Sequence, residues 1–169
     1  MTARRAFAAA AWLTLAGCGY RFAVADAPLP RGILRAHAPV FANRTLEPGV
    51  EALFTQEFRA RLQQAGALGG EADEARVEGE VLSLSGAPTV LDAAGQLASY
   101  RLTATLRLRL LRNGQVLSDT TVTGTEDYLP DRQGADVLRT EQARAAALVR
   151  LAESLSREGY ERLTAAAVR

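Results

Sequence analysis

Strict alternation of apolar and polar side chains marks the middle of the chain as a strand. Between positions 100 and 110 the apolar side chains are Tyr100, Leu102, Ala104, Leu106, Leu108 and Leu110. Arginine and threonine occupy the positions between them. Because successive side chains of a strand point to opposite faces, this period of two predicts a half-buried strand with a polar outer face.

An earlier segment shows the same alternation with an interruption. From position 76 charged residues alternate with apolar or small ones up to Val81, but the next apolar residues are Leu82 and Leu84. A β-bulge near Ser83 would produce this shift, and so would a strand covered on both faces. Residues 88–95 are expected to form a loop.

The dipeptide Asn113-Gly114 predicts a hairpin after the alternating strand, because both residues accept the positive φ angles of a tight turn. A two-residue loop would place Asp119 opposite Leu108, on the apolar face. A three-residue loop would instead set Asp119 opposite Arg107, so we favour that register.

Two stretches show the period of amphipathic helices, 3.6 residues per turn. The first follows Pro48 and ends at Gly66, and its apolar stripe is Val50, Leu53, Phe54, Phe58 and Leu62. The second runs from about Leu138 to the end of the chain. Its inner stripe is Leu148, Leu151, Leu155 and Leu163.

Two further strands complete the expected fold. Residues 33–41 form a short β-like run near a sheet edge, because Pro39 cannot donate to a ladder. Its predicted apolar side is Leu34, Ala36, Ala38 and Val40. Residues 115–128 form the returning strand of the hairpin. The order β-α-β-β-β-α predicts an α+β two-layer sandwich, a mostly antiparallel four-stranded sheet with two helices on one face, as a single domain over residues 33–169.

The first residues have the layout of a secretory signal. Arg4 and Arg5 precede an uncharged, mostly apolar run over residues 6–15. That run is about ten residues long, whereas a membrane-spanning helix needs about 20, so it is typical of a signal peptide.

The end of this run resembles the lipobox of bacterial lipoproteins. Its sequence is Leu15-Ala16-Gly17-Cys18, and in lipoproteins the chain is cut before such a cysteine, which is then acylated. We therefore expect residues 1–17 to be removed and Cys18 to carry covalent lipid. Residues 18–32 would form a tether. Gly19 after the cysteine resembles the sorting signal for the outer membrane.

The charge balance gives no sign of a nucleic-acid partner. The chain has 20 Lys+Arg and 19 Asp+Glu, and every basic residue is arginine. Loss of Arg4 and Arg5 with the signal peptide would leave a net charge near zero, which lacks the basic surface that nucleic acids require.

The chain lacks the residue patterns of common enzymes. His37 is the only histidine, so it has no second histidine with which to bind a metal. No Gly-x-Ser-x-Gly elbow, phosphate loop or dinucleotide fingerprint is present. Carboxylates in or near predicted loops, where solvation is their usual role, are Asp92, Glu126, Asp127, Asp131 and Asp136. We expect no enzymatic activity, no metal and no cofactor.

Several segments spread along the chain form one pattern. They are Cys18-Gly19-Tyr20-Arg21-Phe22, residues 40–51, Ala72-Asp73, Asn113-Gly114, Glu126-Asp127-Tyr128 and residues 143–152. Together these segments resemble the LptE family of lipopolysaccharide-assembly lipoproteins. Their order and spacing match over nearly the whole mature chain.

The resemblance implies a lipoprotein on the periplasmic face of the outer membrane that plugs the LptD β-barrel, helps to assemble it and binds lipopolysaccharide. Candidate contacts to lipopolysaccharide phosphates are Arg101, Arg107 and Arg109, because guanidinium groups bind phosphate with paired hydrogen bonds. Exposed strand arginines are also commonly solvated or paired, and Asp119 is a candidate partner for Arg107. The alternative interpretation is another outer-membrane lipoprotein, such as an activator of a peptidoglycan synthase.

Overall fold

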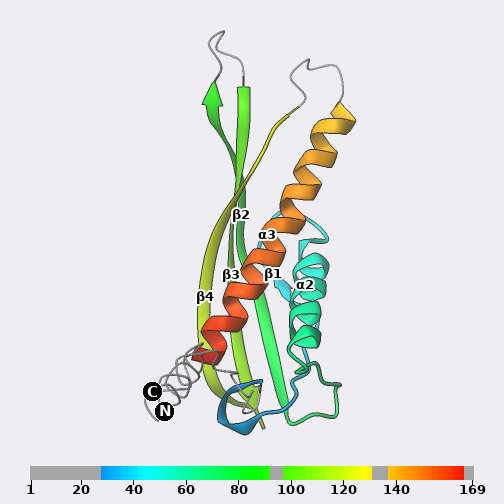
Figure 1. Cartoon of the computed structure of the whole chain (residues 1–169), viewed down its shortest axis with the longest axis vertical. Helices are drawn as coiled ribbons and strands as arrows, with labels where there is room; N and C mark the ends of the chain where they lie inside the picture. Colours follow the sequence, from blue (N-terminus) through cyan, green and yellow to red (C-terminus); the bar gives the residue numbers. More distant parts are fainter. Residues whose placement is uncertain (1–27, 92–96, 131–136, 166–169) are drawn as a thin grey trace, which may run out of the picture.

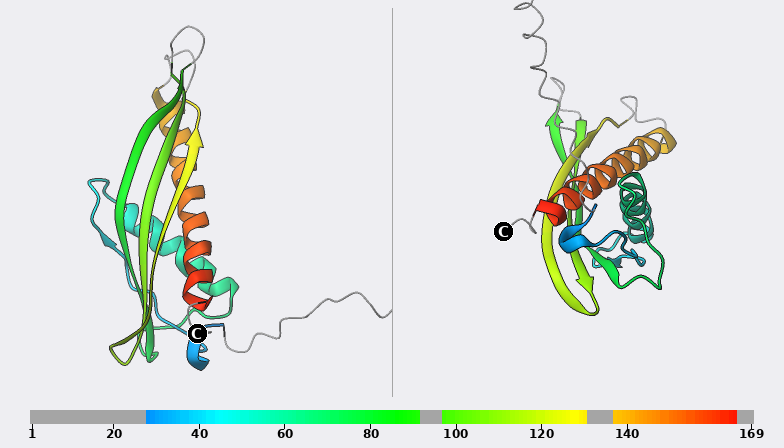
Figure 2. Two further views of the ribbon diagram at one scale, coloured as in Figure 1. Left: turned by 90° about the vertical axis from the view of Figure 1, so that its left-hand side faces the viewer. Right: turned by 60° about the horizontal axis from the view of Figure 1, so that its bottom comes forward.

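The computed structural model describes residues 28–91, 97–130 and 137–165. The elements are η1 (Pro30–Gly32), β1 (Ala42–Asn43), α2 (Val50–Gln64), β2 (Ala75–Leu91), β3 (Leu97–Arg112), β4 (Gln115–Tyr128) and α3 (Val137–Ala165). Figures 1 and 2 show two layers, with both helices on one face of a long, curved sheet. The predicted α+β sandwich is confirmed. The predicted signal peptide and Cys18 lie outside the described residues.

The sheet has the order β1-β2-β3-β4, in which only the β1–β2 pair is parallel. The predicted first strand, residues 33–41, is largely wrong. Ala36 and His37 form isolated bridges, and regular pairing occurs at β1, where Ala42 lies beside Glu80. Leu34 and Val40, which were expected on the buried side, are 67% and 64% exposed. The segment changes partners from Leu68 to β2, so its backbone does not keep the period of a continuous strand.

The interruption in β2 is a bulge, one of the two arrangements that the sequence allowed. Val81 pairs with Leu106 and Ser83 with Thr105, which leaves Leu82 as the extra residue. The strand then continues to Leu91, so the predicted loop at 88–95 begins too early. Pro88 is tolerated because β1 ends far short of it and that edge of β2 needs no amide donor.

The favoured three-residue hairpin register is wrong, and the alternative two-residue loop holds only beside the turn. Asn113 and Gly114 have φ angles of 51° and 79° and form a two-residue turn. Leu111 pairs with Val116 but Leu110 pairs with Ser118, so a bulge in β4 shifts the register by one residue. Leu108 therefore lies opposite Thr120 rather than Asp119. The bulge keeps Asp119 off the apolar face of the sheet, which is what the three-residue loop was expected to do.

The core lies between the apolar face of the sheet and the two helices, as the sequence predicted. The side chains of β3 buried in this core are Leu102, Ala104, Leu106, Leu108 and Leu110. The helices contribute Phe54, Phe58 and Leu62 from α2 and Leu148, Leu151, Leu155 and Leu163 from α3. Two glycines allow α3 to pack closely on the sheet. A Cβ on Gly159 would collide with Leu108, and one on Gly124 would press on Leu155.

The end of the predicted tether packs against the domain. Leu29 and Pro30 are buried, and the Tyr160 hydroxyl donates a 2.5 Å hydrogen bond to the Pro28 carbonyl oxygen. The chain is therefore held by α3 from Pro28 onward, before the predicted domain start at residue 33.

Candidate functional site

The face of the sheet turned away from the helices has no covering layer among the described residues (Figure 2). Among its side chains, the set that we call the polar face is Glu78 and Glu80 of β2, Arg101, Thr103, Thr105, Arg107 and Arg109 of β3, and Asp119, Thr121, Thr123, Thr125 and Asp127 of β4. These residues follow from the alternation of each strand, since every buried leucine of β3 places a polar neighbour on the opposite side. The polar face presents hydroxyls and charges of both signs.

The three candidate arginines all lie on this face, and each is paired with a carboxylate. Arg101 donates to both oxygens of Asp127 at 2.7 and 2.8 Å. Arg107 donates to both oxygens of Asp119 at 3.0 and 2.5 Å, so this pair forms despite the unexpected register. Arg101 lies about 20 Å from Arg107 along β3, at roughly 3.3 Å per residue, so the three do not form one cluster.

Ion pairing fixes the charge state of the polar face. The hydrogen bond from Arg107 lowers the pKa of Asp119, and the hydrogen bond from Arg101 lowers the pKa of Asp127. The same bonds raise the pKa values of both arginines. All four groups are therefore charged at neutral pH.

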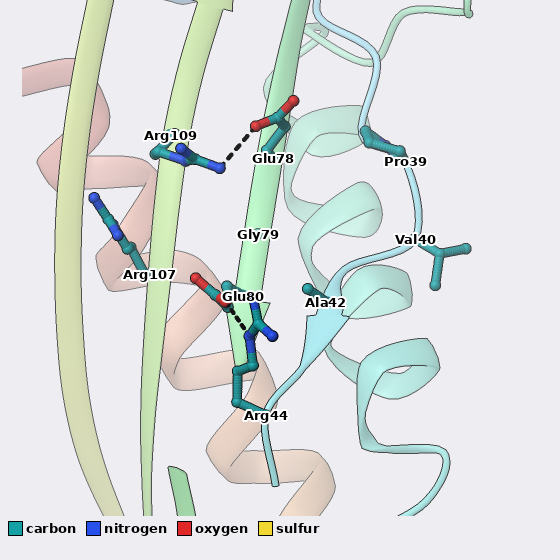
Figure 3. A pocket seen from close by; sticks show the side chains of 9 residues that line it. All are labelled: Pro39, Val40, Ala42, Arg44, Glu78, Gly79, Glu80, Arg107 and Arg109. Atoms are coloured by element: carbon teal, nitrogen blue, oxygen red, sulfur yellow. Dashed lines mark hydrogen bonds and ion pairs between the residues drawn. The ribbon is translucent and has the colours of Figure 1, made fainter. Parts of the chain in front are cut away.

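A groove with a volume of about 500 Å³ lies where β1 meets the polar face (Figure 3). It is lined by Pro39, Val40, Ala42, Arg44, Glu78, Gly79, Glu80, Arg107 and Arg109. Arg109 Nη2 donates to Glu78 Oε2 at 3.0 Å, and Arg44 Nε donates to Glu80 Oε1 at 2.5 Å. The pKa of Glu80 is lowered mainly by the bond from Arg44, and the charges of Arg107 and Arg109 add to the effect.

The groove brings together three guanidinium groups, of which sequence reasoning found two. Arg44 was missed because it follows β1 in a loop, where no alternation marks its direction. Each guanidinium has five N–H donors, and the hydrogen bonds of Arg44 to Glu80 and of Arg109 to Glu78 use one each. The remaining donors can bind phosphate or carboxylate oxygens of a ligand.

The described residues offer no arrangement for metal binding. They contain no group of three or more histidine, cysteine or acidic side chains able to hold an ion. His37 uses its backbone N–H and carbonyl to pair with Ala75 and Val77 of β2. The carboxylate of Glu126 is held by Arg150, and that of Asp127 by Arg101. Asp92, Asp131 and Asp136 lie outside the described residues.

A second polar cluster joins α3 to the loop before α2. Arg144 Nη1 and Nη2 donate to Glu47 Oε1 and Oε2 at 2.8 and 2.7 Å. Asn43 Nδ2 donates to the Glu47 carbonyl and to Glu51 Oε2, both at 2.8 Å. The cluster therefore connects residues 40–51 with residues 143–152, two of the segments that carry the family resemblance.

Comparisons with known proteins agree with this fold. The model of the family LptE, described as lipopolysaccharide-assembly, matches residues 35–163. The structure of rare lipoprotein B from Shewanella oneidensis is similar, with a TM-score of 0.57 and 14% sequence identity over 76% of this chain and 96% of that one. A PelC dodecamer from Paraburkholderia phytofirmans gives a TM-score of 0.51 and 16% identity over 82% of this chain and 91% of that one. No curated protein sequence matches the chain. Within the described residues, none of the helices combines the length and apolar character needed to span a membrane.

Proposed function

The chain belongs to the LptE family of lipopolysaccharide assembly, and we propose that it is a non-enzymatic outer-membrane lipoprotein that plugs an LptD-type β-barrel and helps to assemble it. The observation that carries the proposal is the polar face, which is long, uncovered and nearly balanced in charge. The lumen of an outer-membrane barrel is polar, so a surface of threonines and paired charges suits contact with its wall or its water.

The layered fold supports a role as a plug. Both helices pack on the apolar side of the sheet, so the described part of the domain buries its core without a partner. A domain of about 150 residues is small enough to enter a very large barrel. Its ion-paired polar face would not enter the hydrocarbon core of a bilayer, because burying charges there costs free energy.

Attachment to the membrane would come from lipid on Cys18. Several acyl chains, each burying methylenes at about 0.8 kcal/mol apiece, hold a protein stably at a bilayer. Gly19 follows Cys18 and resembles the sorting signal for the outer membrane, so we place the protein on the periplasmic face of that membrane.

The ligand proposed for the polar face is lipopolysaccharide, through its phosphates. Arg107 and Arg109 would bind in the groove with Arg44, and Arg101 would contact a second phosphate farther along β3. Arginine supplies the forked, permanently charged donors that phosphate binding uses. Part of the binding energy would be lost in weakening the existing ion pairs, so we expect modest affinity at each position.

Affinity purification of the lipidated protein from detergent-solubilised outer membranes, followed by mass spectrometry, tests the main proposal. We expect a barrel of LptD size to accompany the protein. Recovery of a peptidoglycan synthase without such a barrel would overturn the proposal in favour of the alternative lipoprotein function.

Lipopolysaccharide binding is tested by replacing Arg101, Arg107 and Arg109 with glutamine. We expect each substitution to weaken binding, because it removes charge-assisted hydrogen bonds to phosphate. Arg150→Gln is the matched control, since it removes a comparable ion pair with Glu126 away from the polar face. Unchanged affinity in the triple variant would refute the phosphate contacts and leave the barrel proposal standing.

A further inference from the structure

The N-terminal segment leaves the domain at one defined end. Tyr160, near the end of α3, holds the Pro28 carbonyl, and Leu29 and Ile33 are buried beside it. Figures 1 and 2 show this segment at the same end of the molecule as the β3–β4 hairpin and the last turns of α3. The opposite end carries the start of α3 and the last residues of β4.

The distance from this end to the lipid is short. Ten positions separate Pro28 from Cys18. Even a fully extended chain of that length spans at most about 35 Å. If Cys18 carries lipid, which rests on the proposed function, this end of the domain stays within that reach of the bilayer surface and can contact it.

Two arginines and a leucine project from the same end. Leu34 is 67% exposed, and Arg31 and Arg35 are exposed on either side of it in the sequence. We call these three residues the anchor patch. Neither of its arginines forms an ion pair with a carboxylate of the described residues, in contrast to Arg101, Arg107 and Arg109 of the polar face.

The carboxylates beside the patch are already engaged. Asp73 and Glu74 line a shallow depression with Leu34 and Arg35. Asp73 Oδ2 accepts from the Gly70 amide at 2.7 Å, and Glu74 pairs with Arg112 at 3.1 Å. Neither carboxylate forms an ion pair with Arg31 or Arg35, so both guanidinium groups are available to a partner outside the domain.

We infer that the anchor patch docks on the headgroups of an anionic phospholipid bilayer. Arginine places its apolar stem along the interface and its guanidinium among lipid phosphates, while Leu34 enters the boundary of the acyl chains. Each basic residue near an anionic surface adds only a small attraction, so two arginines orient the domain but cannot replace the lipid anchor.

A tryptophan placed in the patch tests the inference. The only tryptophan of the chain, Trp12, lies in the predicted signal peptide, so an introduced one reports alone. Cys18 is also the only cysteine, so the chain from residue 18 can be coupled through it to a maleimide lipid in vesicles. This coupling makes the test independent of lipidation in cells.

Leu34→Trp is compared with Leu129→Trp, which follows β4 at the opposite end and replaces a side chain that is 61% exposed. In vesicles containing phosphatidylglycerol and brominated phosphatidylcholine, we expect Leu34→Trp emission to shift to the blue and lose intensity, with neither change for Leu129→Trp. Adding Arg31→Gln and Arg35→Gln should return the Leu34→Trp signal to that seen without phosphatidylglycerol. Arg139→Gln is the control, because it removes one positive charge at the start of α3, far from the patch. It should leave the Leu34→Trp signal unchanged.

Equal quenching at both tryptophans, or none at Leu34→Trp, would overturn the docking. Quenching that is insensitive to phosphatidylglycerol would overturn the role of the arginines. Neither result bears on whether a barrel accompanies the protein from outer membranes, so failure of this inference and failure of the proposed function are distinguishable.

Discussion

Arg144 and Glu47 lie 97 positions apart and form a two-bond ion pair between α3 and the loop before α2. Their side chains are 27% and 33% exposed, so solvent screens the pair only in part. We expect Arg144→Gln to lower the free energy of unfolding by about 1–2 kcal/mol, because a charged hydrogen bond is lost and Glu47 keeps its desolvation cost.

Urea unfolding of Arg144→Gln, Glu47→Gln and the double variant measures the coupling between the two residues. The double variant should lose less than the sum of the single variants. Glu158→Gln is the control, because its i,i+4 pair with Arg162 is more exposed and should contribute at most about 0.5 kcal/mol. Additive losses would show that the two side chains stabilise the fold independently.

The same pair predicts a dependence of stability on pH. The hydrogen bond from Arg144 is the main cause that lowers the folded pKa of Glu47 below its ordinary value of 4.5. A lowered folded pKa gives stability that is present above the unfolded pKa and is lost as pH falls through the folded pKa. We expect thermal unfolding of the wild type and of Glu47→Gln to converge below pH 4.5. A constant difference in melting temperature across that range would contradict this account.

A glycine in β2 makes room for an aromatic ring. A Cβ on Gly79 would lie 2.5 Å from three ring carbons of Phe41. Because Phe41 is 3% exposed and its ring also contacts Phe58, it has little freedom to move, and Gly79→Ala should destabilise the fold by about 1–3 kcal/mol. Gly70→Ala is the matched control, since nothing lies within 4 Å of its Cβ position. Similar unfolding midpoints for the two variants would show that the ring can shift at low cost.

The hydroxyl of Thr55 joins α2 to the chain entering β1. Its Oγ1 accepts from the Phe41 amide at 2.9 Å and donates to the Glu51 carbonyl at 2.6 Å. Thr55→Val keeps the shape but leaves a buried amide unpaired, so we expect a loss of about 1–3 kcal/mol. Thr55→Ser keeps both bonds and should recover much of the stability in the same denaturant titration. A serine variant as unstable as the valine variant would assign the effect to packing.

The strengths and failures of sequence reasoning have specific physical causes. The alternation of β3 predicted its buried leucines and the direction of Arg101, Arg107 and Arg109, because a strand with one buried face has a fixed period. The hairpin register was missed because the bulge at Leu117 lies between residues of ordinary strand type. Arg44 was missed because its direction depends on the parallel contact between β1 and β2, which links distant segments.

The packing of residues 28–32 against the domain is hard to predict from sequence for a related reason. Leu29 is a single apolar residue between two prolines, so the sequence around it shows no hydrophobic periodicity from which its burial could be predicted. Leu29 is buried next to Pro28, whose carbonyl oxygen accepts a hydrogen bond from Tyr160, 132 positions later in the chain. A contact between the N-terminal segment and α3 can be recognised only once the positions of both in the fold are known.

The contact between Tyr160 and Pro28 gives the last prediction. Tyr160 is 7% exposed, its ring lies 4.8 Å from the Arg61 guanidinium carbon, and burial raises its pKa. Tyr160→Phe keeps the ring but removes the donor to the Pro28 carbonyl. We therefore expect a modest loss of global stability, about 0.5–1.5 kcal/mol, and a larger local effect at residues 28–33.

The Ile33 amide, which donates to the Pro30 carbonyl at 3.2 Å, should exchange its hydrogen faster, whereas the Ala36 amide, bonded to the Ala67 carbonyl at 2.9 Å, should keep its protection. Hydrogen exchange followed by mass spectrometry or NMR distinguishes the two sites. If both amides kept their wild-type rates, the burial of Leu29 rather than the tyrosine hydroxyl would hold this segment to the domain.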